Sequence, residues 1–230
     1  MTALLEAKGL SAGYGKVVVV RDVDLEIRAG EVVALLGPNG AGKSTTLLTL
    51  AGDLKPLGGT VSCLGLDGST SLHRRARAGL ALVTDSKTVL TTLTAAENMR
   101  VFGTTAEAVI ALFPELEPHL RRKVALLSGG QQQMLALGLA LSRDPAVVLA
   151  DELSMGLAPM IVDRLFSALR EAADRGAGVL LVEQHVHKAM AIADRIYVMD
   201  RGRIGISGTA DELRQQVDAI QSSYLADSSA

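Results

Sequence analysis

The segment that decides the fold reads Gly37-Pro38-Asn39-Gly40-Ala41-Gly42-Lys43-Ser44. It satisfies the pattern G-x-x-x-x-G-K-[ST] and follows the apolar run of residues 32–36, which predicts a buried strand leading through a glycine-rich turn into a helix. The glycines let backbone N–H groups converge on an anion, and the helix N-terminus adds partial positive charge. Lys43 can reach the β- and γ-phosphates of a nucleotide, and the Ser44 hydroxyl can bind Mg²⁺. The segment therefore predicts a phosphate loop, with an ordinary glycine-rich turn as the alternative.

A second apolar run ends in two acidic residues. Residues 146–150 predict a buried strand, and Asp151 and Glu152 follow at its carboxyl end, where ligands bind in parallel α/β sheets. Asp151 suits a Mg²⁺ position, directly or through water, and Glu152 suits a general base that polarises a hydrolytic water. The alternative is that both carboxylates cap the next turn. The phosphate loop in the same chain favours the functional interpretation.

Strand and helix patterns alternate along most of the chain. Helical patterns occupy residues 72–78, 131–142 and about 159–175, and Thr209-x-x-Glu212 opens a last helix. This alternation predicts an α/β fold with a mainly parallel sheet covered on both faces, preceded by an antiparallel β part. Apolar runs predict the strands at residues 4–8, 17–20, 23–27, 32–36, 60–63, 80–83, 146–150, 179–182, 196–199 and 204–206.

The strand patterns stop between about residues 86 and 127. Residues 94–125 look helical and open with the capping pattern Thr94-x-x-Glu97. We interpret this stretch as a small helical insertion in a single domain that spans residues 1–230. The α/β core then comprises residues 1–85 and 128–225, and residues 226–230 form a tail.

The composition excludes several classes of protein. Of the 230 residues 48% are hydrophobic, but only six are aromatic, so small aliphatic side chains must build the core. The formal net charge of −2 offers no basic footprint for nucleic acid, and the basic cluster at residues 73–77 is interpreted as a solvated helix face. No apolar run approaches the roughly 18 to 20 residues of a membrane span, and the N-terminus lacks a secretory signal pattern. These features, with the lone Cys63 expected in the core, predict a cytoplasmic protein.

A second helix N-terminus is built for close backbone approach. Residues 127–131 read Leu-Ser-Gly-Gly-Gln and precede a long apolar helix, with Ser128 available as the N-cap. Taken alone, this stretch is also what a well-capped helix requires. What favours a functional role is the order in which the phosphate loop, the Leu-Ser-Gly-Gly-Gln stretch and the strand ending in Asp-Glu occur in one chain.

With these three motifs the chain resembles the ATP-binding subunits of ABC transporters over essentially its whole length. The resemblance implies that the signature segment of one subunit, Ser128-Gly129-Gly130-Gln131, closes on the γ-phosphate of ATP held by the phosphate loop of a partner subunit. It implies that residues 154–159 form a loop at the dimer seam and that Tyr14 stacks on adenine, although a core tyrosine is the alternative for Tyr14. The implied nucleotide-binding residues are Tyr14, Gly37, Pro38, Asn39, Gly40, Ala41, Gly42, Lys43, Ser44 and Thr45.

The resemblance also implies partners. An ATPase of this kind works with Mg²⁺ as a homodimer or as a heterodimer with a related subunit, and its helical insertion grips integral membrane permease subunits. A solute-binding protein acts through the permease, and the ATPase is peripheral on the inner face of the cell membrane. Within the family, Gly156-Leu157-Ala158-Pro159 and Val182-Glu183-Gln184 look like the importers of branched-chain amino acids, as do Tyr14-Gly15-Lys16 and Ser223-Tyr224-Leu225.

Three positions depart from the family pattern. The family spacing places Gln184, rather than a histidine, at the γ-phosphate switch position, where it can donate a hydrogen bond but cannot titrate. Asp85 occupies the place of a glutamine that reaches Mg²⁺ and the membrane subunits, and Leu153 replaces a proline. These departures keep a second hypothesis open, in which the chain hydrolyses ATP weakly and completes a partner's site in a heterodimer. A third hypothesis, work on nucleic acid or in translation, predicts a duplicated cassette, a coiled coil or a basic arm, none of which the sequence contains.

Overall fold

A six-stranded sheet forms the centre of the molecule. The computed structural model describes residues 3–84 and 88–214. The strand order is β10-β9-β3-β8-β7-β6, in which the five strands from β9 to β6 run parallel and β10 pairs antiparallel with β9. The strands are β3 (Val32–Leu36), β6 (Leu80–Val83), β7 (Val147–Asp151), β8 (Gly178–Glu183), β9 (Arg195–Asp200) and β10 (Arg203–Thr209).

A four-stranded antiparallel sheet precedes it, as the sequence predicts. Its order is β2-β1-β4-β5, from strands β1 (Ala3–Tyr14), β2 (Val17–Arg28), β4 (Gly58–Cys63) and β5 (Leu66–Asp67). The prediction of separate strands at residues 17–20 and 23–27 is wrong, because β2 is continuous. Asp22 has a positive φ of 54° and shifts the pairing register there without ending the strand.

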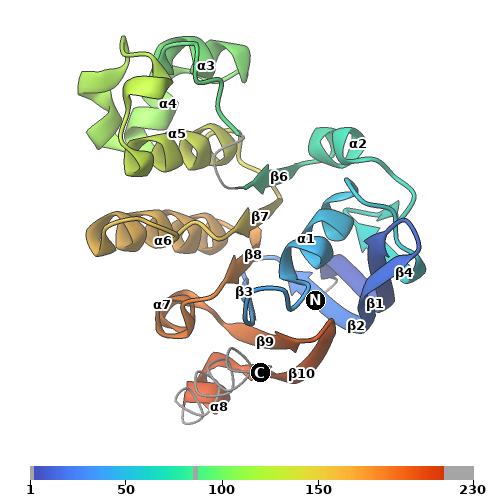
Figure 1. Cartoon of the computed structure of the whole chain (residues 1–230). Coiled ribbons are helices and arrows are strands. Elements are labelled where there is room, and N and C mark those ends of the chain that lie inside the picture. The colour runs from blue at the N-terminus through green and yellow to red at the C-terminus, as the bar shows by residue number, and fades with distance from the viewer. Residues whose placement is uncertain (1–2, 85–87, 215–230) are drawn as a thin grey trace.

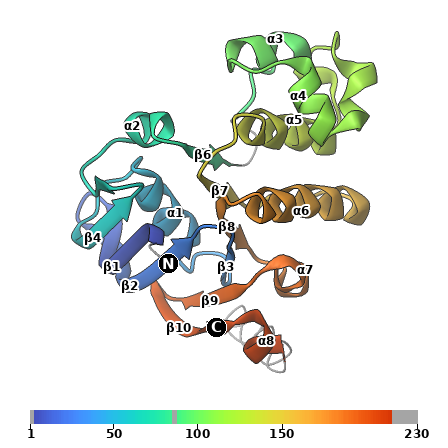
Figure 2. The same cartoon turned by 180° about the vertical axis from the view of Figure 1, so that it is seen from behind.

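The helices cover the sheets unequally. In Figures 1 and 2 the helices of residues 95–141 lie together at one end of the molecule, away from β1, β2 and β4. Side-chain capping boxes begin α3, α5 and α8, at Thr94, Ser128 and Thr209, where the sequence predicted caps. The helical segments are α1 (Lys43–Ala51), α2 (Leu72–Arg77), α3 (Ala95–Val101), α4 (Ala106–Leu112), η1 (Pro114–His119), η2 (Val124–Leu126), α5 (Gly129–Leu141), α6 (Pro159–Asp174), α7 (Val186–Ile192) and α8 (Ala210–Leu213). No helix among the described residues is long and apolar enough to cross a membrane.

The parallel sheet is buried on both faces. Along β3, Val32, Ala34 and Leu36 pack with α3 to α7, whereas Val33 and Leu35 pack with α1 and the antiparallel sheet. Alternate residues of a strand point to opposite faces, so an uninterrupted apolar run fits a strand covered on both sides. The phosphate helix α1 and the signature helix α5 consequently lie on opposite faces of this sheet.

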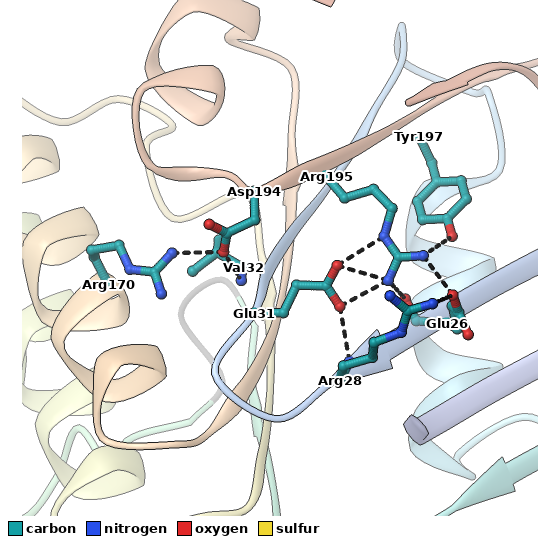
Figure 3. Close-up of polar contacts among 8 residues, drawn as sticks. All are labelled: Glu26, Arg28, Glu31, Val32, Arg170, Asp194, Arg195 and Tyr197. Atoms are coloured by element: carbon teal, nitrogen blue, oxygen red, sulfur yellow. Dashed lines mark hydrogen bonds and ion pairs between the residues drawn. The ribbon is translucent and has the colours of Figure 1, made fainter. Parts of the chain in front are cut away.

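The amino edge of the sheet carries a closed network of charges between β2, β3 and β9 (Figure 3). Arg195 donates from Nε to Oε1 of Glu31 at 2.8 Å, from Nη2 to Oε2 of Glu31 at 2.8 Å and from Nη1 to Oε1 of Glu26 at 2.7 Å. Its guanidinium also lies 5.6 Å from the ring centroid of Tyr197. Burial acts to lower the pKa of Arg195, but its hydrogen bonds to Glu31 and Glu26 outweigh this and raise that pKa.

One cation of the cluster at residues 73–77 is not solvated. His73, Arg74 and Arg77 are exposed as predicted, but Arg75 is completely buried. Its guanidinium donates to the carbonyl oxygens of Leu50, at the end of α1, and of Asp67. The prediction was wrong for Arg75 because α2 turns it inward, where the free carbonyls at the C-terminal end of a helix accept from a cation.

Candidate active site

The phosphate loop joins the carboxyl end of β3 to α1. Gly42 is the N-cap of α1 and has a φ of 104°, a conformation that favours glycine. At Gly37 a Cβ atom would lie 2.3 Å from the carbonyl oxygen of Met199 in β9, so only glycine fits there. A Cβ at Gly42 would lie 3.2 Å from Cγ2 of Val20, which shows that β2 packs against the loop. The loop is therefore shaped as its glycines predicted.

Lys43 turns back over its own loop. Its Nζ donates to the carbonyl oxygens of Gly37 at 2.9 Å and Pro38 at 3.1 Å, and the side chain is only 4% exposed. Nζ also lies 3.4 Å from Oε1 of Glu152. An ammonium buried next to one carboxylate and two carbonyl oxygens is well placed to exchange these acceptors for phosphate oxygens.

Asp151 ends β7 beside Ser44, the first hydroxyl of α1. Burial raises the pKa of Asp151, and a hydrogen bond from the Ser44 hydroxyl opposes this rise. Its Oδ1 atom is buried and accepts no hydrogen bond from the residues that the structure describes. A carboxylate oxygen without a partner next to a hydroxyl fits Mg²⁺, which prefers oxygen ligands of this kind.

Glu152 follows Asp151 in a left-handed backbone conformation, with a φ of 47°. This conformation costs a non-glycine residue free energy, of the order of 1–3 kcal/mol. The Glu152 N–H donates to the carbonyl oxygen of Val182 in β8 at 2.9 Å, which holds the turn in place. The turn brings the carboxylate to Lys43, so both predicted acids lie at the phosphate loop.

A third carboxylate at this edge was not predicted as a site residue. Glu183 ends β8 and is only 1% exposed. Its Oε1 accepts from the Ser154 N–H at 3.1 Å, and its Oε2 accepts from the Ser154 hydroxyl at 2.7 Å and from the Gln184 N–H at 3.3 Å. The signal in the sequence was an acidic residue that directly follows the apolar run of residues 179–182.

Tyr14 lies at the end of β1, in the turn to β2. Its side chain is 52% exposed, which excludes the alternative of a core tyrosine. Val17, its cross-strand partner, is also largely exposed. The turn thus presents an aromatic ring and an apolar neighbour to solvent, close to the β2 residues that contact the phosphate loop.

The signature segment opens α5. The Ser128 hydroxyl accepts from the Gln131 N–H at 3.3 Å, and the Gln131 side chain accepts from the Ser128 N–H at 3.0 Å. Ser128 and Gly129 are exposed, while Gly130 is buried against α6. A Cβ atom at Gly130 would lie 2.9 Å from the Ile161 side chain of α6, so the close packing favours glycine there. The cap and the close packing serve the helix itself, and they also leave an exposed helix N-terminus.

The remaining predicted positions divide into three groups. Gln184, His185 and His187 are exposed, and Gln184 directly follows β8 at the edge that carries Glu183. Leu153 is fully buried in the core, where an apolar side chain packs well. Asp85 lies outside the described residues.

The geometry can be compared with known proteins. Residues 20–154 match the ABC transporter family. The chain belongs to this family. Members of the family are ATP-hydrolysing subunits of transporters, so the predicted ATPase activity and the predicted P-loop α/β fold are confirmed. The roles of the individual site residues in this ABC ATPase stay predictions.

Relatives and solved structures cover nearly the whole ABC chain. The high-affinity branched-chain amino acid transport ATP-binding protein BraG of Pseudomonas aeruginosa is 37% identical, over 91% of this chain and 94% of BraG. The probable branched-chain amino acid transport ATP-binding protein LivF of Archaeoglobus fulgidus is 36% identical, with 91% and 94% covered. The lipopolysaccharide export system ATP-binding protein LptB of Acidithiobacillus ferridurans is 33% identical, with 99% and 98% covered. A solved ATP-binding subunit of an ABC transporter is 29% identical with a TM-score of 0.82, over 96% of this chain and 99% of that one.

Proposed function

We propose that this chain binds and hydrolyses MgATP to energise a membrane importer, with branched-chain amino acids or a related small polar solute as its cargo. The observation that carries the proposal is the meeting of Lys43, Asp151 and Glu152 at one edge of the parallel sheet, with Nζ of Lys43 3.4 Å from Oε1 of Glu152. Two acids and a buried ammonium converge where strands β3 and β7 end. This is the set of groups that phosphoryl transfer to water requires.

Binding involves the phosphate loop and the β1–β2 turn. The N–H groups of residues 39–45 surround the phosphates, and the helix dipole of α1 favours their charge. Lys43 leaves the carbonyl oxygens of Gly37 and Pro38 and binds the β- and γ-phosphates. Tyr14 stacks its exposed ring on adenine.

Hydrolysis relies on the acidic groups. Glu152 accepts a proton from the attacking water as general base, and Gln184 donates a hydrogen bond to the γ-phosphate oxygens. Ser44 and Asp151 would hold Mg²⁺, with Asp85 as a further candidate ligand, and the ion would neutralise charge on the phosphates. Lys43 separates from Glu152 when phosphate arrives, which frees the carboxylate to act on water.

A complete site requires a second subunit. Since α1 and α5 pack on opposite faces of the parallel sheet, the signature residues Ser128, Gly129, Gly130 and Gln131 meet the phosphates held by another copy or by a related subunit. Met155 lies within the proposed seam loop and Met160 directly follows it, and they are 61% and 78% exposed. Exposed methionines in such a loop suit an adaptable protein interface.

The permease and the cargo follow from the helical insertion and from the relatives. A cavity of about 540 Å³ lies between α2, β6 and α5, with Leu80, Phe102 and Leu139 in its apolar wall and Arg77 and Arg143 at its border. It suits an amphipathic helix from a membrane subunit. As part of such an importer, the chain would lie on the inner face of the membrane. A solute-binding protein would then act through the permease. The names of BraG and LivF support amino acids as cargo, whereas LptB is an export protein of similar identity.

Purification of the chain with its membrane partners tests the proposal. We expect MgATP hydrolysis that Lys43→Ala abolishes, and permease subunits that co-purify and transport branched-chain amino acids in vesicles. Recovery without any membrane protein would reject the transport assignment. The heterodimer hypothesis, which rests on Asp85, Leu153 and Gln184, predicts instead low turnover that rises when a related ATPase subunit is added.

A further inference from the structure

Glu183 joins two loops at the carboxyl edge. It accepts two hydrogen bonds from Ser154, the first residue of the seam loop (residues 154–159), and one from the N–H of Gln184. The seam loop follows β7 and Gln184 follows β8, so one side chain holds the exits of two neighbouring parallel strands. Glu152 lies two residues before Ser154 and is anchored to β8 by its own N–H.

The chemistry of these contacts requires a carboxylate. Three donors converge on two oxygens, and a carboxylate can accept all three bonds. A glutamine at this position has one acceptor oxygen, and its NH₂ group would face at least one N–H donor. A neutral amide costs less to bury than a carboxylate that is 1% exposed. Burying the Glu183 carboxylate therefore costs free energy, and the three hydrogen bonds that join the two loops offset this cost.

We propose that Glu183 is a positioning residue that makes the seam loop and the γ-phosphate-facing Gln184 move as one unit. This inference rests on the proposed function, because the seam loop has a partner only in the assembled dimer. When the second subunit contacts residues 154–159, a displacement of Ser154 is passed through the Glu183 carboxylate to the backbone of Gln184. The two ATP sites are thereby coupled through a link of two side chains.

A matched pair elsewhere in the chain provides a control. Glu97 accepts from the Thr94 N–H at 2.7 Å and from the Thr94 hydroxyl at 2.7 Å, which is the same chemistry as in the Glu183 and Ser154 pair. Glu97 belongs to the capping box of α3, in the helical insertion and outside both loops of the carboxyl edge. Glu97→Ala thus removes both bonds without touching the proposed link.

The test compares ATP hydrolysis by the purified parent with that by Glu183→Gln, Ser154→Ala, the double variant and Glu97→Ala, all below their Tm. For Glu183→Gln we expect kcat to fall by about tenfold, KM for ATP to change by less than about twofold, and the Hill coefficient to fall toward 1. Ser154→Ala should lower kcat by about threefold, and the double variant should be no slower than Glu183→Gln, since both act through one link. Glu97→Ala should lower Tm, because the cap of α3 is lost, but leave kcat and the Hill coefficient unchanged.

The outcomes separate this inference from the proposed function. A parent chain without MgATP hydrolysis rejects the proposed function itself. A parent that hydrolyses ATP while Glu183→Gln keeps its kcat and Hill coefficient overturns the positioning role alone, as do fully additive losses in the double variant. If Glu183→Gln does not fold, Ser154→Ala decides: an unchanged kcat and Hill coefficient overturn the link, and a threefold loss with unchanged KM supports it.

Discussion

The two edges of the parallel sheet handle charge in opposite ways. At the amino edge Arg195, Glu26 and Glu31 satisfy one another (Figure 3), and hydrogen bonding to Arg195 holds the pKa of Glu26 below its usual range. At the carboxyl edge burial raises the pKa of Asp151, and one of its oxygens has no partner among the described residues. The paired charges of the amino edge stabilise the packing of the strands, whereas a buried charge with an unpaired oxygen is typical of a ligand-binding site.

A second set of contacts makes the amino edge self-sufficient. Arg170 of α6 donates to Oδ2 of Asp194 at 2.7 Å, and the same oxygen accepts from the N–H of Val32 at 2.8 Å. These contacts tie the start of β3 and the approach to β9 to a helix. The network fixes the frame from which the phosphate loop projects at the other end of β3.

The largest expected effect is a loss of turnover at the carboxyl edge. Glu152→Gln removes the general base and should lower kcat by about 10²- to 10⁴-fold while ATP still binds. Steady-state hydrolysis and nucleotide binding by fluorescence titration measure the two quantities, with thermal unfolding as the control for folding. Equal turnover in the variant and the parent would remove Glu152 from its role.

The next largest effect is a loss of stability when the charge network of the amino edge is disrupted. Arg195→Met leaves Glu31 without its cation and leaves Glu26 with Arg28 alone, and it should lower the free energy of unfolding by about 2–4 kcal/mol. Because the network is remote from the nucleotide, kcat below the Tm of the variant should stay as in the parent. Urea unfolding and hydrolysis assays check the pair of results. A free energy of unfolding equal to that of the parent would contradict the division between the edges. A lower kcat at temperatures where the variant is folded would contradict it as well.

A smaller effect concerns the exposed rim of the site. Tyr14→Ala should raise KM for ATP by about five- to tenfold, because a stacked base contributes roughly 1–3 kcal/mol. Tyr14→Phe keeps the ring and is expected to keep KM. Neither substitution should move Tm by much, since the side chain is half exposed. An unchanged KM in Tyr14→Ala would place adenine elsewhere.

The smallest expected effect is the pH dependence of the free energy of unfolding that Asp151 contributes at the carboxyl edge. The folded chain disfavours the charged form of Asp151, so the contribution of this group to stability is present below its unfolded pKa and is lost as pH rises through its raised folded pKa. Asp151→Asn should therefore raise the free energy of unfolding of the nucleotide-free chain at pH 7 by about 0.5–1 kcal/mol. Urea unfolding at several pH values measures this gain, which should shrink toward pH 4. A variant less stable than the parent at pH 7 would show that the Asp151 charge is already paired.

How much of the fold and of the candidate site could be predicted depends on how far apart the contacting residues are in the sequence. The phosphate loop, the Asp151-Glu152 pair and the capping boxes are local patterns, and the structure has them where the sequence predicted. The amino-edge network was not predicted, because Arg195 and Glu31 are 164 residues apart. The burial of Arg75 likewise depends on carbonyl oxygens contributed by other elements.

Glu183 shows the same limit within the site. Its acceptor role depends on Ser154, which is 29 residues away and is brought near only because β7 and β8 are neighbours in the sheet. The helix α7 was also missed, because seven residues give too short a period to recognise between two strands.

The most direct measurement is the rise in Tm that saturating MgATP gives to the parent, Lys43→Ala and Arg195→Met. Ligand at about 100 times Kd stabilises a folded chain by roughly 2.7 kcal/mol, which corresponds to about 5–10 °C for a protein of this size. The division between the edges predicts the full rise in the parent and in Arg195→Met, despite the lower starting Tm of Arg195→Met, and no rise in Lys43→Ala. A full rise in Lys43→Ala, or its loss in Arg195→Met, would contradict the assignment of the carboxyl edge to nucleotide and of the amino edge to the frame.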